Sequence, residues 1–233
     1  MDIASRFCAP AGYFAAIEAA AWRRCRQGIR RSGRLFRWQT LAAACGILLS
    51  APASAIFPFT DEEWALLPDY CHHQSNVSIH HRATRSPRWE AYFREDFPSI
   101  HHWCAVYMWM GRAYKAGPAS TSGRFYLGRA EDDLGYFLDR ARKDSPILAE
   151  VYTKRGEIYL LQKRFDRAED SFKRAREIDP ARPQAYFLWA HYLYSSGKIA
   201  DARAVAEDGL AHAPESKSLQ GLVADIKAGK PTP

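Results

Sequence analysis

Histidine and cysteine side chains are concentrated in one stretch of this 233-residue chain. Six of the eight histidines form three adjacent pairs between residues 72 and 102, and two of the five cysteines flank them. The set comprises His72, His73, His80, His81, His101 and His102, with Cys71 and Cys104. Because imidazole and thiolate are good ligands for transition metals, these residues could form a metal-handling or redox-active site.

A polar loop followed by the start of a helix is the competing interpretation, and the spacing favours it. Adjacent residues on a helix or strand point in different directions, so a histidine pair rarely supplies two ligands to one ion. The chain also lacks a Cys-x-x-Cys motif, and with it the haem-attachment motif. We therefore predict no metal and no cofactor, and keep a metal-handling or redox-active function of residues 71–104 as the alternative.

The first 55 residues have the composition of an export signal. They contain eight arginines and two acidic residues, an apolar run over residues 41–49, and a small-x-small site that ends at Ala55. These features predict a signal peptide that is cleaved after Ala55, and hence a periplasmic or exported protein. A leader retained as a single-pass anchor in the inner membrane is the alternative, and it would be the chain's membrane contact.

The leader also accounts for most of the chain's formal charge of +7. Residues 56–233 contain 25 basic and 24 acidic residues. Such a balance is not the basic footprint of a phosphate-binding surface, so we predict no nucleic-acid partner. Motifs of serine hydrolases, zinc proteases and phosphate loops do not occur, so we also predict no enzyme.

Cleavage of the leader would remove three cysteines and leave Cys71 and Cys104. An even pair of cysteines in an oxidising compartment is most simply a disulfide. Closing a loop of about 33 residues would stabilise the fold by roughly 3–4 kcal/mol in the chain-entropy account.

Helix-start signals surround the cysteines and histidines. Thr60 and Glu63 form a capping box, and Ser86-Pro87 places a cap and a first-turn proline before an aromatic-rich segment. Pro98 and Ser99 precede a further helix that runs to about Ala116. We expect residues 56–101 to form a helical segment that caps the rest of the fold.

A fixed interval organises the remainder of the chain. Pro146, Pro180 and Pro214 lie 34 residues apart, and so do Ala168 and Ala202. A period of this length indicates a stacked array of similar units. Within residues 149–180 apolar side chains recur every three or four positions on each side of a polar corner, which predicts two antiparallel helices joined by a tight turn.

This unit resembles the tetratricopeptide repeat. Its positions match that family's signature at Tyr152, Gly156, Tyr159, Ala168, Phe172, Ala175 and Pro180, whereas Arg155 stands where the family usually has leucine. The resemblance covers about residues 102–228 and implies an all-α fold, a short solenoid of helical hairpins behind a non-repeat helical cap. Its parts are units at 102–146 with an inserted loop at 117–127, at 149–180 and at 183–214, then a capping helix at 215–228 and a tail at 229–233.

In the resembled family, the first helix of each unit lines a groove that binds a partner. Carrying that register over gives Met108, Arg112, Lys115, Thr153, Glu157, Leu160, Phe187, His191 and Tyr194. Side chains of such mixed character suit an extended peptide or a partner helix. Together with the leader and the absence of catalytic motifs, the resemblance therefore predicts an exported scaffold that binds a protein or peptide in the cell envelope, as in assembly or secretion machinery. The oligomeric state is left open.

Overall fold

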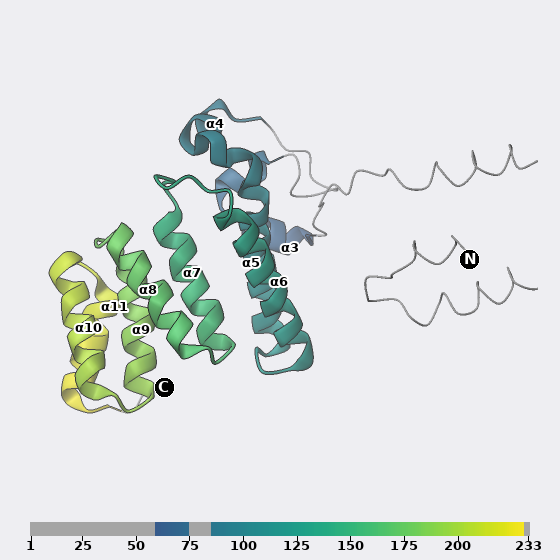
Figure 1. Ribbon diagram of the computed structural model, residues 1–233. Coiled ribbons are helices and arrows are strands. Elements are labelled where there is room, and N and C mark those ends of the chain that lie inside the picture. Colours follow the sequence, from purple (N-terminus) through teal and green to yellow (C-terminus); the bar gives the residue numbers. More distant parts are fainter. Residues whose placement is uncertain (1–58, 75–84, 231–233) are drawn as a thin grey trace, which may run out of the picture. The chain divides into compact units, whose positions relative to one another are not determined.

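The computed structural model describes residues 59–74 and 85–230, and these belong to one compact unit, Ser54–Pro233 (Figure 1). Every regular element in the described ranges is a helix, and consecutive helices pack in pairs. The predicted all-α solenoid of helical hairpins is confirmed. The leader and the His80–His81 pair lie outside the described residues.

The segment before the hairpins consists of short helical elements. These are α3 (Asp61–Ala65), η2 (Asp69–His73), α4 (Pro87–Phe93) and η3 (Arg94–Ser99). The predicted capping box is present, since Thr60 accepts a hydrogen bond from the Glu63 amide and the Glu63 carboxylate accepts one from the Thr60 amide. Pro87 occupies the first turn of α4, where its missing N–H costs nothing.

The first hairpin is longer than the repeats that follow. It comprises α5 (Ile100–Ala116) and α6 (Thr121–Leu138). The loop expected over residues 117–127 is wrong, because Ser120 caps α6 by accepting a hydrogen bond from the Gly123 amide. The predicted loop includes Gly123. A Cβ at this position would lie 2.1 Å from the Gly117 carbonyl oxygen, so the tight corner requires glycine. Most of the added residues therefore lengthen the helices.

The 34-residue pattern appears as two regular hairpins and a final helix. Their bounds are α7 (Leu148–Leu161), α8 (Phe165–Ile178), α9 (Pro183–Ser195), α10 (Ile199–His212) and α11 (Lys217–Ala228). The corner between α7 and α8 contains Lys163 at φ 60°, and the corner between α9 and α10 contains Gly197 at φ 77°. Both corners adopt the left-handed conformation that turns a chain sharply.

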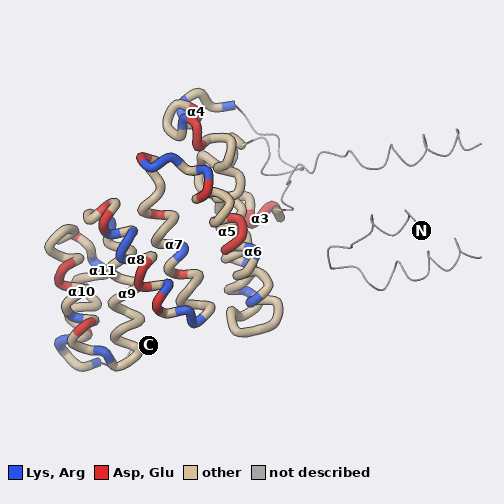
Figure 2. Tube along the Cα trace, viewed as in Figure 1, with Lys and Arg blue, Asp and Glu red and all other residues tan. Residues whose placement is uncertain are grey.

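Buried side chains divide into two cores that meet within α7. The first core gathers residues from Phe59 to Ile158 and is rich in large aromatics such as Trp103 and Phe137. The second begins at Tyr159 and extends to Ile226, with alanines at the helix crossings. Basic and acidic residues are interspersed along α7, α8 and α10, in line with the nearly neutral charge of this part of the chain (Figure 2).

Candidate functional site

Cys71 and Cys104 are joined by a disulfide that links η2 to α5. Their Cα atoms lie 5.8 Å apart, and both side chains are fully buried. A thiolate from solvent could reach neither sulfur without local opening of the fold. The bridge is therefore placed to hold two elements together rather than to exchange electrons with a partner.

The first histidine pair is used locally. The Nε2 atom of His72 lies 2.9 Å from the Trp64 carbonyl oxygen, and the two rings stack with centroids 4.8 Å apart. His73 faces the carboxylate of Asp69 at 3.8 Å, one helical turn away. The two imidazoles thus have separate partners.

The third pair is buried between α5 and α6. Nδ1 of His102 lies 2.6 Å from one oxygen of Asp133, and the Trp109 indole donates to the other oxygen at 2.7 Å. Burial, followed by the charge of His102, lowers the pKa of His101 to about 4. His102, Asp133 and Trp109 therefore form a buried polar link between two helices.

No group of three histidine, cysteine or acidic side chains is placed to hold a metal ion within residues 59–74 and 85–230. The described part of the cluster consists of one disulfide and histidines that already have local partners. His80 and His81 complete the sequence pattern but lie outside these ranges.

The groove positions predicted on α5 are largely covered by the preceding segment. Met108 is 2% exposed in the first core, so its prediction as a groove residue is wrong. Arg112 forms a two-pronged ion pair with Glu63 of α3, with N–O distances of 2.7 and 2.8 Å. Only Lys115 is exposed among the three. The family register presumes an uncovered first helix, whereas α3 here packs beside α5.

On α7 the predicted groove residues differ in their burial and in their hydrogen-bond partners. Thr153 is buried, and its hydroxyl donates to the Ala149 carbonyl at 2.7 Å, so it is unavailable to a partner. Glu157 accepts hydrogen bonds from Lys154 of its own helix and Tyr114 of α5. Leu160 is half-buried beside the second core.

On α9 two of the three predicted residues remain accessible. Phe187 and His191 are half-buried one turn apart, with ring centroids separated by 5.8 Å. Tyr194 is 8% exposed, and its hydroxyl contacts the backbone carbonyls of Asp225 and Lys230. Tyr194 thus ties α9 to the end of α11, and its prediction as a groove residue is wrong because the last helix covers it.

Polar contacts join the first hairpin to α7. Tyr107 donates to Glu150 at 2.5 Å, and burial first, then nearby charge, raises the pKa of Tyr107. At the α7–α8 corner, Arg164 and Gln162 both donate to Glu131 of α6, at 2.7 and 3.0 Å. Both carboxylates therefore already have partners, and Glu150 also lies 3.7 Å from Arg182.

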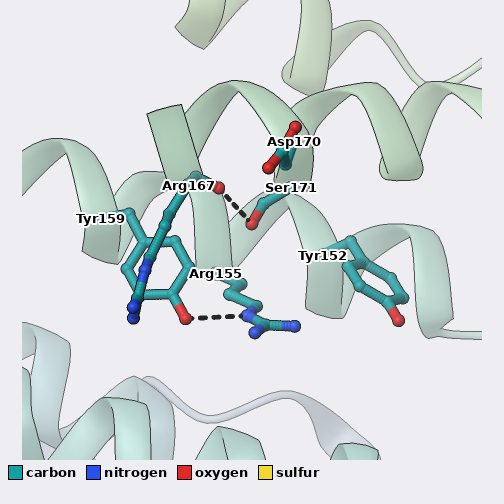
Figure 3. A pocket seen from close by; sticks show the side chains of 6 residues that line it. All are labelled: Tyr152, Arg155, Tyr159, Arg167, Asp170 and Ser171. Atoms are coloured by element: carbon teal, nitrogen blue, oxygen red, sulfur yellow. Dashed lines mark hydrogen bonds between the residues drawn. The ribbon is translucent and has the colours of Figure 1, made fainter. Parts of the chain in front are cut away.

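A cavity that the sequence analysis did not single out lies between the two helices of the hairpin at residues 148–178 (Figure 3). We call it the α7–α8 pocket. It has a volume of about 230 Å³ and is lined by Tyr152, Arg155, Tyr159, Arg167, Asp170 and Ser171. The signal that could have found it was Arg155, the one departure from the repeat signature, which places a guanidinium where leucine would fill the space between helices.

Comparison with protein families supports the repeat pattern. Two family profiles, both described as tetratricopeptide repeat, match residues 134–183 and residues 159–226. No solved structure gives a significant match. Within the described residues, none of the helices combines the length and apolar character needed to cross a membrane.

Curated relatives match parts of the chain. Tetratricopeptide repeat protein 28 is 37% identical over 83 residues in Homo sapiens and 36% identical in Mus musculus, and each match covers 36% of this chain and 3% of the relative. Protein O-mannosyl-transferase TMTC1 of Mus musculus is 26% identical over 113 residues, which is 48% of this chain and 12% of that protein. This chain thus spans a small fraction of the length of each of these relatives.

Proposed function

Because this chain is a tetratricopeptide repeat protein, we propose that it is an exported scaffold that binds another protein or peptide in the cell envelope, as part of assembly or secretion machinery. Tetratricopeptide repeats bind protein partners, and the family is typically non-enzymatic. The observation that carries the proposal is the pair of regular hairpins, α7–α8 and α9–α10, whose sequence and packing follow the repeat pattern.

The surface proposed to receive the partner comprises the accessible positions on α7 and α9. Leu160, Phe187 and His191 are half-buried and combine apolar, aromatic and polar character. Such a surface can pack against an amphipathic segment while leaving hydrogen-bonding groups at its edge. Lys115, exposed near the end of α5, adds a positive charge to the candidate set.

The proposed location rests on the leader and on the cysteine pair. Arginine-rich residues 1–55 end in a small-x-small site, and Cys71 and Cys104 form a disulfide, which persists in oxidising compartments. N-terminal sequencing of the native protein should find Ile56 as the first residue. Alkylation of that protein without reductant should modify neither cysteine. An intact leader with two reactive thiols would contradict export and cleavage.

The partner is tested by photo-crosslinking in cells. A photoreactive amino acid replaces His191 or Phe187 in the full chain, and a matched position, exposed Ala204 on α10, is the control. We expect a discrete protein adduct from the two α9 positions and none from position 204. Equal adducts at all three positions, or none at the α9 positions, would contradict the proposed surface.

No observation on the described residues favours the metal-handling or redox-active alternative. The disulfide is fully buried, and the histidines beside it have hydrogen-bonding or stacking partners.

A further inference from the structure

We infer that the α7–α8 pocket binds one carboxylate group of the partner, either on an acidic side chain or at the partner's C-terminus. The inference rests on the proposed function for the existence of a protein partner, and it specifies the chemistry of one contact. Three features carry it, namely two arginines that are not ion-paired, the arrangement of donors along one edge of the pocket, and the size and charge of the pocket.

The two arginines of the pocket differ from Arg164 and Arg174 of the same hairpin. Arg164 is paired with Glu131 at 2.7 Å and Arg174 with Glu177 at 3.0 Å. Arg155 and Arg167 form no ion pair with any carboxylate of the described residues. A guanidinium presents five donors in a fixed fork that suits a carboxylate, so two such groups in one cavity form an incomplete anion site.

Hydrogen bonds position one of these groups without neutralising it. The Nε atom of Arg155 donates to the Tyr159 hydroxyl at 3.1 Å, and its guanidinium lies over the Tyr159 ring, 5.4 Å from the centroid. This contact orients the fork and leaves the terminal nitrogens of Arg155 as donors. The Ser171 hydroxyl is used within α8, where it donates to the Arg167 carbonyl at 2.7 Å.

Figure 3 shows that the donors gather along one edge of the pocket. The guanidinium groups of Arg155 and Arg167 and the hydroxyls of Tyr152 and Tyr159 all lie on that edge. The carboxylate of Asp170 lies toward the opposite side, apart from both guanidinium groups. Asp170 therefore does not complete the site that the arginines form.

The size and charge of the pocket select the ligand. A volume of about 230 Å³ is smaller than the sites that enclose whole drug-sized ligands, so it suits a single group carried by a larger partner. Two arginines and one aspartate leave a net charge of +1 in the lining, which matches a carboxylate better than a doubly charged phosphate. The tyrosine rings offer apolar surface to the methylene groups beside that carboxylate.

Nitrogen-15 NMR of the arginine Nε–H groups in the full chain tests the inference directly. The probes are three short peptides, Ac-Ala-Glu-Ala-NH₂, Ac-Ala-Gln-Ala-NH₂ and Ac-Ala-Gln-Ala with a free C-terminus, together with inorganic phosphate. We expect saturable shifts of the Arg155 and Arg167 signals with at least one carboxylate peptide and weaker binding of the amidated glutamine peptide. Whichever of the two carboxylate peptides binds more tightly shows whether the pocket prefers an acidic side chain or a C-terminus.

Variants give effects of opposite sign. Arg155→Leu restores the usual repeat residue, so it should fold, and we expect it to weaken the favoured peptide about tenfold when the Arg167 signal is followed. Asp170→Asn removes a repelling charge and should tighten binding about twofold to fivefold. Arg203→Gln on α10 is the matched control and should leave the affinity unchanged. Thermal unfolding of each variant confirms that it is folded.

Several outcomes would overturn the inference. These are no saturable shift at either arginine, equal binding of the amidated glutamine peptide, tighter binding of phosphate, or unchanged affinity in Arg155→Leu. If a crosslinked partner binds the wild type and Arg155→Leu equally, the carboxylate contact fails while the scaffold function stands. If carboxylate peptides bind but crosslinking finds no partner, the pocket stands and the proposed function fails.

Discussion

The two cores of this protein are stabilised in different ways. The first is stabilised by links between residues far apart in sequence, including Cys71–Cys104 and the Glu63–Arg112 ion pair. The second is built from a repeated register in which alanine and glycine let helices approach closely. One region therefore depends on a few specific long-range contacts, whereas the other depends on the regularity of its packing.

Removal of the disulfide is the strongest way to test that difference. The bridge closes a separation of 33 residues, so the Cys71→Ala, Cys104→Ala double variant should lose about 3–4 kcal/mol of unfolding free energy in the first region. Guanidinium unfolding followed by indole NMR measures it, with Trp103 reporting on the first core and Trp189 on the second. An equal fall at both indoles would mean that the cores unfold as one unit.

Lowering the pH should destabilise the first region through His101. Burial, and then the charge of His102, holds the pKa of His101 near 4, below the ordinary value of 6.5. The unfolded chain therefore takes up a proton that the folded protein excludes, and stability is lost as the pH falls from about 6.5 to about 4, by up to about 3 kcal/mol. His101→Gln should flatten the pH dependence of unfolding over this window, and parallel curves for variant and wild type would contradict the burial argument.

Two glycines, one in each region, differ in how closely other atoms pack against them. A Cβ on Gly209 would lie 2.7 Å from the Cβ of Tyr186, which the backbone fixes in place. Gly209→Ala should therefore cost about 1–3 kcal/mol through forced separation of the helices. On α6, a Cβ at Gly128 would meet nothing within 4 Å, so Gly128→Ala should stabilise the protein by about 0.5–1 kcal/mol. Thermal unfolding measures both, and effects of the same sign would remove the proposed distinction.

The sequence could predict the second region well because its physical determinants are local and periodic. Prolines 34 residues apart and small residues at helix crossings predict α7 to α10 without knowledge of any distant contact. The capping box at Thr60 is equally local, and it is present. Periodicity of this kind can be recognised in a single sequence because each unit carries the same local pattern and contacts mainly its neighbours.

The rest of the fold and the pocket depend on tertiary contacts, which local sequence patterns do not predict. Gly123 looks like a loop residue, but it lies in the first turn of α6, where it packs against the Gly117 carbonyl. Met108 lies on the face that the family leaves open, but the N-terminal segment makes that face part of a core. The α7–α8 pocket was missed for a similar reason, since Arg155 could be recognised as a mismatch but not as the wall of a cavity.

The ion pair between α3 and α5 gives the smallest effect and tests whether the N-terminal segment truly covers the first helix. Burial alone would raise the pKa of Glu63, but hydrogen bonds from Arg112 and the Thr60 amide, with the charges of Arg112 and Lys115, lower it overall. A lowered pKa in the folded state means that the stabilisation is present above the ordinary value of 4.5 and is lost as the pH falls through the folded-state pKa.

Glu63→Gln should therefore cost about 1 kcal/mol at neutral pH, and its difference from the wild type should shrink under acid. The matched control is Glu207→Gln, which removes an exposed partner of Arg203 and Lys227 in the second region and should have no measurable effect. Denaturant unfolding at neutral and acidic pH measures both variants. A loss at Glu207 as large as that at Glu63 would show that ion pairs stabilise the repeats as well, and the contrast between the two regions would then rest on the disulfide alone.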